Sequence, residues 1–242
     1  NGEGGDDTIS GESGDDILLG GIGNDVLDGG PGVDQLWGQA GNDDLAGGVD
    51  ADNIFGGDGS DTVHWSSADG ADVVQGGDGT DLLDVDYTAA AETVVVNSIP
   101  VSSEDFQRVQ VADGTDSIDV AGVEDLDISL GAGADDLTLN DLSSTEVDVV
   151  QIDLGSADAA ADSVHLLGAD GRSYDLSISS DQLTGDVHVD GLSAAVQIGS
   201  AESSDTLEVT GGDRDDSLNA SADVSGVITV ELRGALGDDL LS

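Results

Sequence analysis

The sequence predicts an all-β protein built from stacked coils, and three observations support this prediction. A nine-residue motif recurs nine times between residues 2 and 84, and a fixed repeat of this kind indicates a solenoid. Beyond it, apolar and polar residues alternate with period two, for example over 126–139 and 196–209, which favours strands over helices. Glycine, with 37 of the 242 residues, recurs between these segments as expected for turns. We therefore divide the chain into a repeat region, 1–84, and a less regular β region, 85–242.

The charge of the chain limits its partners. The 53 acidic residues face only four arginines, lysine is absent, and the formal net charge is −49. A chain with this charge repels nucleic acid and anionic membranes, so we expect no nucleic-acid partner and no membrane insertion. The carboxylates are either cation ligands, or a solvation coat for high salt, or a disordered acidic tail. Because the sequence contains no cysteine, a disulfide framework and a thiolate metal site are both excluded.

Each repeat carries an aspartate at position 6 and an aliphatic residue at position 8. The units run from GEGGDDTIS, which starts at Gly2, to GGDGTDLLD, with one two-residue expansion near Ala68 and Asp69. A disordered acidic tail does not keep such a phase, so that alternative fails for this region. The aspartates at position 6 are Asp7, Asp16, Asp25, Asp34, Asp43, Asp52, Asp61, Asp72 and Asp81. The aliphatic residues at position 8 are Ile9, Leu18, Leu27, Leu36, Leu45, Ile54, Val63, Val74 and Leu83.

The pattern G-G-x-G-x-D-x-U-x over residues 2–84 resembles the repeats-in-toxin (RTX), or haemolysin-type, calcium-binding nonapeptide family. This resemblance implies a right-handed parallel β-roll with two nonapeptides per coil and a row of Ca²⁺ ions along each edge. It also implies the ligands of one ion, which are the carbonyls at positions 2 and 4 with the aspartate at position 6, and, two repeats on, the carbonyls at positions 1 and 3 with the next aspartate. The glycines assigned as carbonyl ligands on this basis are Gly21, Gly23, Gly30, Gly32, Gly38, Gly41, Gly47, Gly56, Gly57, Gly59 and Gly76.

Electrostatics gives an independent reason to expect cations. With two repeats per coil, Asp7 stacks on Asp25 and Asp16 on Asp34, at the strand spacing of ~4.8 Å. Two carboxylates about 5 Å apart repel by roughly 3 kcal/mol at an effective dielectric constant near 20. Summed along both edges, this repulsion is comparable with the ~5–15 kcal/mol stability of a whole domain. Hard oxygen ligands with flexible geometry favour Ca²⁺ over Mg²⁺ or transition metals.

The nine units contain seven pairs of aspartates two repeats apart, which predicts about seven Ca²⁺ ions in residues 1–84. The expansion makes the pair Asp52/Asp72 the least regular, and Glu3 and Glu12 replace glycine at position 2 of the first two turns. Seven ions add +14 to the net charge of −49 and leave −35. The remaining charge indicates either further calcium downstream or a halophile-like coat, and the sequence leaves both open.

After residue 84 the nine-residue phase is lost. The stretch 92–97 reads as a strand, and later segments resemble the degenerate coils found beside nonapeptide blocks in secreted RTX proteins. We expect a continued solenoid with coils of roughly 20–25 residues that re-enters the repeat phase at 234–242. Aspartates that precede its strands are second-rank calcium candidates, with ordinary turn aspartates as the alternative. They are Asp116, Asp136, Asp205, Asp216 and Asp239.

Position 9 of each repeat is expected to face solvent. On one sheet it carries Leu19, Trp37 and Phe55, an exposed apolar ladder in a chain with only six aromatic residues. Either the segment 85–110, including Phe106, covers this ladder, or the ladder is a docking surface for an adjacent domain or a neighbouring copy.

Enzymatic signatures are lacking in the sequence. It has three histidines and contains no H-E-x-x-H pair, no G-x-S-x-G elbow and no phosphate-binding loop followed by lysine. We therefore predict a non-enzymatic, secreted or cell-surface calcium-binding module of a larger adhesin, surface-layer or filament protein, whose folding is coupled to Ca²⁺. The alternatives are a secretion-assisting module of a secreted enzyme or toxin, or a polysaccharide-acting β-solenoid.

Overall fold

A computed structural model describes the chain except for residues 88–90, 100–107, 114–115, 156–159, 170, 182–183, 185, 193 and 225–226. The described residues form 24 strands and contain no helix. They therefore include no helix long and apolar enough to cross a membrane. The predicted all-β fold of parallel strands is confirmed. The chain forms two compact units. Unit 1 contains Asn1–Asp86, Ile99–Asp127 and Thr145–Val147, and unit 2 contains Tyr87–Ser98, Ile128–Ser144 and Asp148–Ser242.

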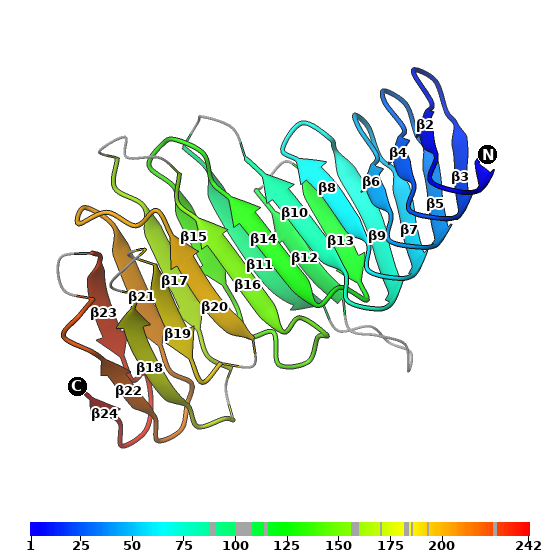
Figure 1. The fold of residues 1–242 in the computed structure, drawn as a ribbon. Coiled ribbons are helices and arrows are strands. Elements are labelled where there is room, and N and C mark those ends of the chain that lie inside the picture. The colour runs from blue at the N-terminus through cyan, green and yellow to red at the C-terminus, as the bar shows by residue number, and fades with distance from the viewer. Residues whose placement is uncertain are drawn as a thin grey trace. The chain divides into compact units, whose positions relative to one another are not determined.

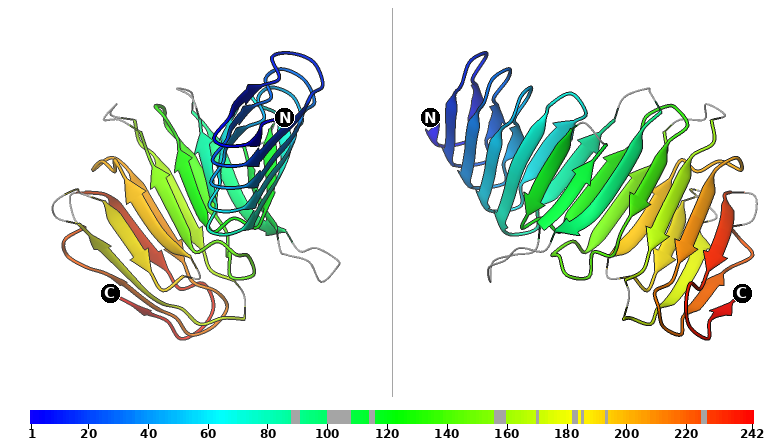
Figure 2. Two further views of the ribbon diagram at one scale, coloured as in Figure 1. Left: turned by 45° about the vertical axis from the view of Figure 1, so that its right-hand side comes forward. Right: turned by 180° about the vertical axis from the view of Figure 1, so that it is seen from behind.

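Unit 1 begins as a stack of coils, blue to cyan in Figure 1, in which each coil adds one strand to each of two sheets. Seen close to end-on in Figure 2, these coils are flattened loops. One sheet has the spatial order β1 (Glu3–Gly4), β3 (Ile17–Ile22), β5 (Gln35–Ala40), β7 (Asn53–Asp58), β9 (Ala71–Asp78), β13 (Ser117–Ala121) and β12 (Arg108–Ala112). The other has β2 (Thr8–Ser10), β4 (Val26–Asp28), β6 (Asp44–Ala46), β8 (Thr62–Ser66) and β10 (Leu82–Asp86).

The repeat sets the register and the core of these coils. Leu36 pairs with Leu18 on one side and with Ile54 on the other, so identical positions stack every 18 residues. Because neighbouring residues of a strand point to opposite faces, the position-8 residues all face inward. From Leu18 to Leu83 they are at most 3% exposed, and only Ile9, in the first coil, is half-buried. Trp65, in the expanded repeat, joins this core at 2% exposure.

Unit 2 also has two sheets, with longer connections. One contains the parallel strands β11 (Thr93–Ile99), β15 (Asp136–Leu139), β17 (Ser163–Leu167), β21 (Thr206–Thr210) and β23 (Thr229–Arg233). The other contains, in spatial order, β16 (Val149–Asp153), β20 (Ala195–Gly199), β19 (Val187–Asp190), β18 (Asp175–Ser180), β22 (Ser217–Ala220) and β24 (Leu240–Leu241). The strand β14 (Asp125–Ser129) has residues in both units.

The coils of unit 2 are less uniform than the sequence predicted. Leu137 pairs with Val164 after 27 residues, Val164 with Leu207 after 43, and Leu207 with Val230 after 23. Only the last step agrees with the expected coil of roughly 20–25 residues. The longest step includes β18, β19 and β20, where β19 is antiparallel to both neighbours and adds a local excursion to the coil.

Candidate metal centres

The position-6 aspartates lie in two rows, one at each edge of the coils. In each row the backbone N–H of one aspartate donates to Oδ1 of the aspartate one coil further on, at 2.7–2.8 Å. The pairs are Asp7/Asp25, Asp25/Asp43, Asp43/Asp61 and Asp61/Asp81 in one row, and Asp16/Asp34, Asp34/Asp52 and Asp52/Asp72 in the other. The structure therefore brings together all seven pairs that the repeat spacing indicates.

The second oxygen of these carboxylates is buried and faces the turn. A Cβ atom added to Gly20 would lie 2.5 Å from Asp25 Oδ2 and 2.8 Å from the carbonyl oxygen of Gly38, at position 1 of the next coil. The two oxygens thus converge on one space. An unpaired buried carboxylate oxygen is energetically unfavourable unless a donor or a cation satisfies it. Within the described residues, Oδ2 is buried and lacks a hydrogen-bond partner in Asp7, Asp25, Asp34, Asp43, Asp52, Asp61 and Asp81.

Backbone carbonyls of consecutive coils face the same turns. A Cβ atom added to Gly21 would lie 2.5 Å from the carbonyl oxygen of Glu3, so the position-2 carbonyl points towards the next coil. The position-3 carbonyl points the opposite way, because Ala40 O accepts the Gly23 N–H at 2.8 Å. At position 1, added Cβ atoms would meet the aspartate of the same repeat; these glycines are Gly38, Gly47, Gly56 and Gly76. The assigned glycines at positions 2 and 4 all have positive φ; they are Gly21, Gly23, Gly30, Gly32, Gly41, Gly57 and Gly59.

In the repeats over residues 2–84, four described residues other than glycine adopt the same left-handed backbone. Glu3, Glu12 and Gln39 at position 2 have φ of 69°, 69° and 80°, and Asp50 at position 4 has φ of 87°. This region is unfavourable for residues with a Cβ atom. The turn geometry therefore persists where the sequence departs from glycine, at the expense of local strain.

Burial makes it difficult for the aspartate rows to stay ionised on their own. Burial raises the pKa of Asp72 to about 7, although hydrogen bonds from the Asp52 backbone and the Trp65 indole partly oppose this shift. Burial likewise raises the pKa of Asp52 and of Asp81 to about 6, and repulsion by the neighbouring aspartate of the row adds to it. The pKa values of Asp43 and Asp61 are raised for the same main reason. Either a proton or a cation relieves this unfavourable charge.

The donor set fits calcium better than other metals. In the part of the chain that the structure describes, no three His, Asp or Glu side chains converge as a metal site. Each pair supplies two carboxylates at most, and the remaining oxygens that face the turn are backbone carbonyls. Ca²⁺ accepts carboxylate and carbonyl oxygens in six- to eight-fold coordination, whereas Zn²⁺ prefers nitrogen and sulfur ligands.

Similar bonds occur at acidic residues that the sequence analysis did not select. In unit 1, Asp81 N–H donates to Glu124 Oε2 at 2.9 Å. In unit 2, Asp135 N–H donates to Asp162 Oδ1 at 2.9 Å, and Asp162 N–H to Asp205 Oδ1 at 3.1 Å. Each of these acids stands two residues before a buried aliphatic residue, the relation that links positions 6 and 8. That signal in the sequence identifies them.

Two of the second-rank candidates lie outside such rows. Asp136, selected from the sequence, is exposed and contacts His165 at 3.2 Å, while its neighbour Asp135 is 2% exposed and occupies the row. Asp116 donates its N–H to Asp113 Oδ1 at 3.0 Å, as an ordinary turn residue does. The other three, Asp205, Asp216 and Asp239, accept backbone N–H groups from the preceding coil.

Comparison with known families identifies the repeat region. The family profile "RTX calcium-binding nonapeptide repeat (4 copies)" matches residues 1–36, 28–63 and 67–86. The repeats within residues 1–86 match the RTX calcium-binding nonapeptide family. The predicted family resemblance is confirmed for this RTX region, which contains all nine position-6 aspartates. The RTX repeat is a structural calcium-binding unit and not a catalytic one. No curated protein matches the chain.

The outer face of the RTX region carries the predicted apolar ladder. Leu19, Trp37 and Phe55 stand side by side on β3, β5 and β7, and all three are half-buried. The rings of Trp37 and Phe55 are stacked, with centroids 5.4 Å apart and planes within 8° of parallel. Phe106, whose segment 85–110 was one of the two alternatives for the ladder, lies outside the described residues.

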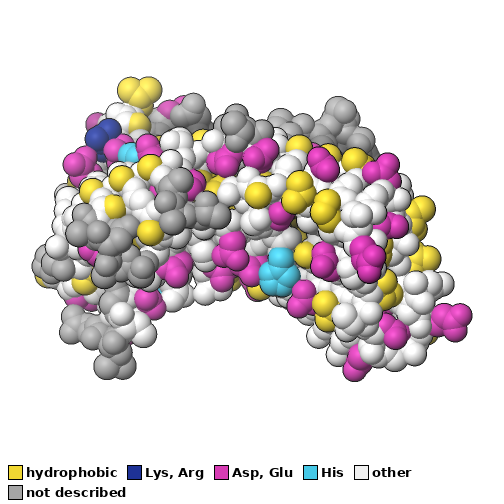
Figure 3. Space-filling model, turned by 90° about the horizontal axis from the view of Figure 1, so that it is seen from above, with side chains coloured by type: hydrophobic (Ala, Val, Ile, Leu, Met, Phe, Trp, Pro, Cys, Tyr) yellow, Lys and Arg dark blue, Asp and Glu magenta, His cyan; other side chains and the backbone are white. Residues whose placement is uncertain are grey.

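Histidines sit between carboxylates on outward faces. His64, at position 9, lies 3.3 Å from Asp44 and 2.9 Å from Asp84, each on an adjacent strand. His165 lies similarly between Asp136 and Glu208, at 3.2 and 3.4 Å. Figure 3 shows acidic side chains spread among apolar ones over the face in view. Each of these two imidazoles thus contacts carboxylates of two neighbouring strands.

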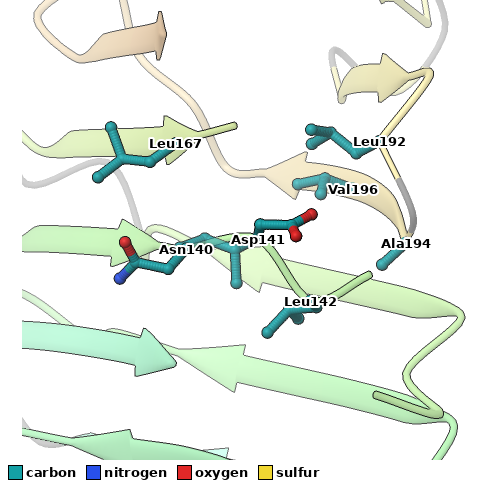
Figure 4. A pocket seen from close by; sticks show the side chains of 8 residues that line it. Asn140, Asp141, Leu142, Leu167, Leu192, Ala194 and Val196 are labelled. Atoms are coloured by element: carbon teal, nitrogen blue, oxygen red, sulfur yellow. The ribbon is translucent and has the colours of Figure 1, made fainter. Parts of the chain in front are cut away.

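Unit 2 contains a small pocket, shown in Figure 4. Its lining comes from the ends of β15 and β17, from β20 and from the adjoining segments, and is mainly apolar. Asp141 is the only ionisable residue in that lining, so the pocket lacks a paired acid and base. The lining residues are Leu139, Asn140, Asp141, Leu142, Leu167, Leu192, Ala194 and Val196.

Proposed function

We propose that the RTX region is a calcium-dependent folding module of a secreted or cell-surface protein, with about seven Ca²⁺ ions between its coils. The observation that carries this proposal is the row of buried Oδ2 atoms. Each faces a turn and, within the described residues, has no hydrogen-bond partner. In Asp25, Oδ1 accepts the Asp7 N–H of the neighbouring coil, and Oδ2 faces the same space as the Gly38 carbonyl oxygen.

One complete site illustrates the proposed ligands. Between the third and fifth repeats, the ion takes the carbonyl oxygens of Gly21 and Gly23 with Asp25. From the next coil it takes the carbonyl oxygens of Gly38 and Ala40 with Asp43. The orientations of the carbonyls at positions 1, 2 and 3 support this assignment. The remaining aspartate pairs follow the same scheme, and the ion supplies positive charge where two carboxylates and several carbonyls meet.

The same charges make folding depend on the ion. Without calcium, the buried aspartates oppose the compact state through desolvation and mutual repulsion. Binding of Ca²⁺ to the folded coils alone shifts the equilibrium towards them. Sites with dissociation constants of ~10⁻⁴–10⁻³ M suit millimolar extracellular calcium. The chain would thus stay expanded where calcium is scarce and fold outside the cell.

The proposed biological role is structural and non-enzymatic, within an adhesin, a surface layer or a filament. The support for a structural role comes from the RTX repeats, whose match is to a calcium-binding repeat unit. A secretion-assisting module of a secreted enzyme or toxin would use the same calcium-coupled folding. The ladder of Leu19, Trp37 and Phe55 is proposed as the contact surface for a neighbouring copy or an adjacent domain.

The test is a calcium titration of the metal-free full chain, followed by far-UV circular dichroism and size-exclusion chromatography. We expect a cooperative gain of β signal and a smaller hydrodynamic radius with Ca²⁺, and neither with Mg²⁺. Concentrated NaCl serves as the second control. Folding by NaCl alone would show that the carboxylates form a halophilic coat, and would overturn the proposal.

A further inference from the structure

Unit 2 contains two turns built like those of the RTX region, although they lie outside the residues that the family profile matches. The segments 211–219 (GGDRDDSLN) and 234–242 (GALGDDLLS) each have glycine at position 1, aspartate at position 6 and leucine at position 8. Their aspartates, Asp216 and Asp239, stand one coil apart at a spacing of 23 residues, against 18 in most of the RTX region.

The hydrogen bonds between these turns are those of the RTX rows. Asp216 N–H donates to Asp239 Oδ1 at 3.0 Å, the bond that joins consecutive aspartates in each row. One residue earlier, Asp238 N–H donates to Asp215 Oδ1 at 2.9 Å, as Asn24 N–H does to Asp6 Oδ1. The longer coil therefore leaves the turn itself unchanged.

The oxygens that would face an ion are also in place. Asp216 is 3% exposed, and its Oδ2 is buried without a hydrogen-bond partner among the described residues. This oxygen occupies the space that a Cβ atom on Gly211 would need. Gly237 has φ of 128°, and a Cβ atom there would lie 2.6 Å from the carbonyl oxygen of Arg214. A polar hollow lined by Ser173, Asp213, Arg214 and Asp215 lies beside the turn.

The preceding coil of the same row carries a tyrosine in place of the aspartate. Tyr174 N–H donates to Asp216 Oδ1 at 2.7 Å, so Tyr174 occupies the row position. A Cβ atom on Gly168 would lie 2.6 Å from Cε2 of the Tyr174 ring. A Cβ atom on the equivalent position-1 glycine of the RTX region would lie against a carboxylate instead. The Tyr174 hydroxyl accepts the Ala169 N–H at 2.7 Å and donates to Asp141 Oδ1 at 3.4 Å. Asp141 is the carboxylate shown in Figure 4.

We infer that the turns at 211–216 and 234–239 bind one further Ca²⁺ ion, and that the Tyr174 ring ends this row by filling the place of the carboxylate in the preceding coil. The inference rests on the proposed calcium function of the RTX region. Its ligands are Asp216, Asp239 and the carbonyl oxygen of Arg214, with the other carbonyls of the two turns. Two carboxylates and several carbonyls form an oxygen set suited to Ca²⁺. A neutral phenol in place of a carboxylate removes both charge and space from the preceding turn.

Counting bound ions on the full chain tests this inference. Native mass spectrometry at saturating Ca²⁺ gives an integer number of ions for each variant. Asp216→Asn keeps an acceptor for the Tyr174 N–H but places an amide NH₂ where Oδ2 faces the turn, and it should lose one ion. The matched control, Asp136→Asn, alters an exposed aspartate of the same unit and should lose none. Asp34→Asn, which lies in the RTX region, reports separately on the proposed function.

The reverse substitution predicts a gain of one bound ion, and unfolding of the variant cannot produce such a gain. Tyr174→Asp restores the carboxylate opposite Gly168 and should bind one ion more than the unaltered chain, whereas Tyr174→Phe should bind the same number. An unchanged count in both Asp216→Asn and Tyr174→Asp, while Asp34→Asn loses ions, overturns the inference and leaves the proposed function intact. A chain that binds no Ca²⁺ at all overturns both.

Discussion

Asp25 donates its backbone N–H to Oδ1 of Asp43 at 2.8 Å, while the Oδ2 atoms of both residues are buried and lack hydrogen-bond partners among the described residues. The two oxygens of each carboxylate therefore have different roles. Oδ1 accepts a backbone N–H and so links consecutive coils. Oδ2 faces the turn together with backbone carbonyls, so its stability depends on what enters that turn.

The first prediction separates these roles at Asp43. Asp43→Asn keeps the Oδ1 acceptor but removes the charge, so it should lower the calcium affinity of the adjoining sites and the Tm in Ca²⁺. Loss of one ion held at 100 times its Kd removes about 2.7 kcal/mol from the free energy of unfolding. Chemical denaturation in Ca²⁺ measures this change. The neighbouring Asp44→Asn, on the exposed face, should stay within about 0.5 kcal/mol of the parent. Equal losses in the two variants would contradict the prediction.

The second prediction concerns pH in the calcium-free protein. Asp72 titrates at about 7 in the folded chain, against an ordinary value of 3.8, so the folded state holds more protons between these pH values. Stability must then fall as pH rises through this interval. Calcium-stripped protein, which is expanded at neutral pH, should therefore show more β signal by far-UV circular dichroism at pH 5 than at pH 8. Asp72→Asn should weaken that dependence. A β signal that grows with rising pH in the stripped protein would disprove it.

The third prediction concerns the left-handed turn at Gln39, whose φ is 80°. Glycine adopts this conformation freely, so Gln39→Gly should stabilise the RTX region by about 1 kcal/mol. Gln35 is an equally exposed glutamine at the start of the same strand, β5, and has no positive φ. Gln35→Gly should therefore destabilise the RTX region by about 0.5–1 kcal/mol, because it only adds backbone freedom to the unfolded chain. Denaturation midpoints of the two variants that shift in the same direction would contradict this explanation.

The sequence predicted the RTX region closely because each of its turns carries its own local signal. Gly20, Asp25 and Leu27 already specify a turn, a row position and a core position, and the repeat length then places each residue above its counterpart. In unit 2 the steps between paired parallel strands range from 23 to 46 residues, so spacing no longer identifies counterparts.

The residues that sequence reasoning missed are of two kinds. Asp135 carries a signal in the sequence, because it stands two residues before the buried Leu137, whereas its neighbour Asp136 stands two residues before Thr138. Tyr174 stands in a row position without any acidic signal, because its ring fills the space that a carboxylate would otherwise occupy. Such substitutions preserve the shape of a turn while changing its chemistry, and only the three-dimensional contacts reveal them.

The last prediction concerns the stacked rings of Trp37 and Phe55 on the outer face of the RTX region. Stacked aromatic pairs contribute about 0.5–1.5 kcal/mol beyond the area they bury, so a double-mutant cycle of Trp37→Ala and Phe55→Ala should give a coupling energy in this range. Gln75, the next residue on the ladder beside Phe55, provides the matched control and should show little coupling to Trp37. Size-exclusion chromatography of the same variants tests the proposed contact surface. If the ladder contacts a neighbouring copy, Trp37→Ala should abolish a concentration-dependent dimer at a small loss of stability. A monomeric parent chain whose Tm falls with Trp37→Ala would show instead that the rings serve the stability of the coil alone.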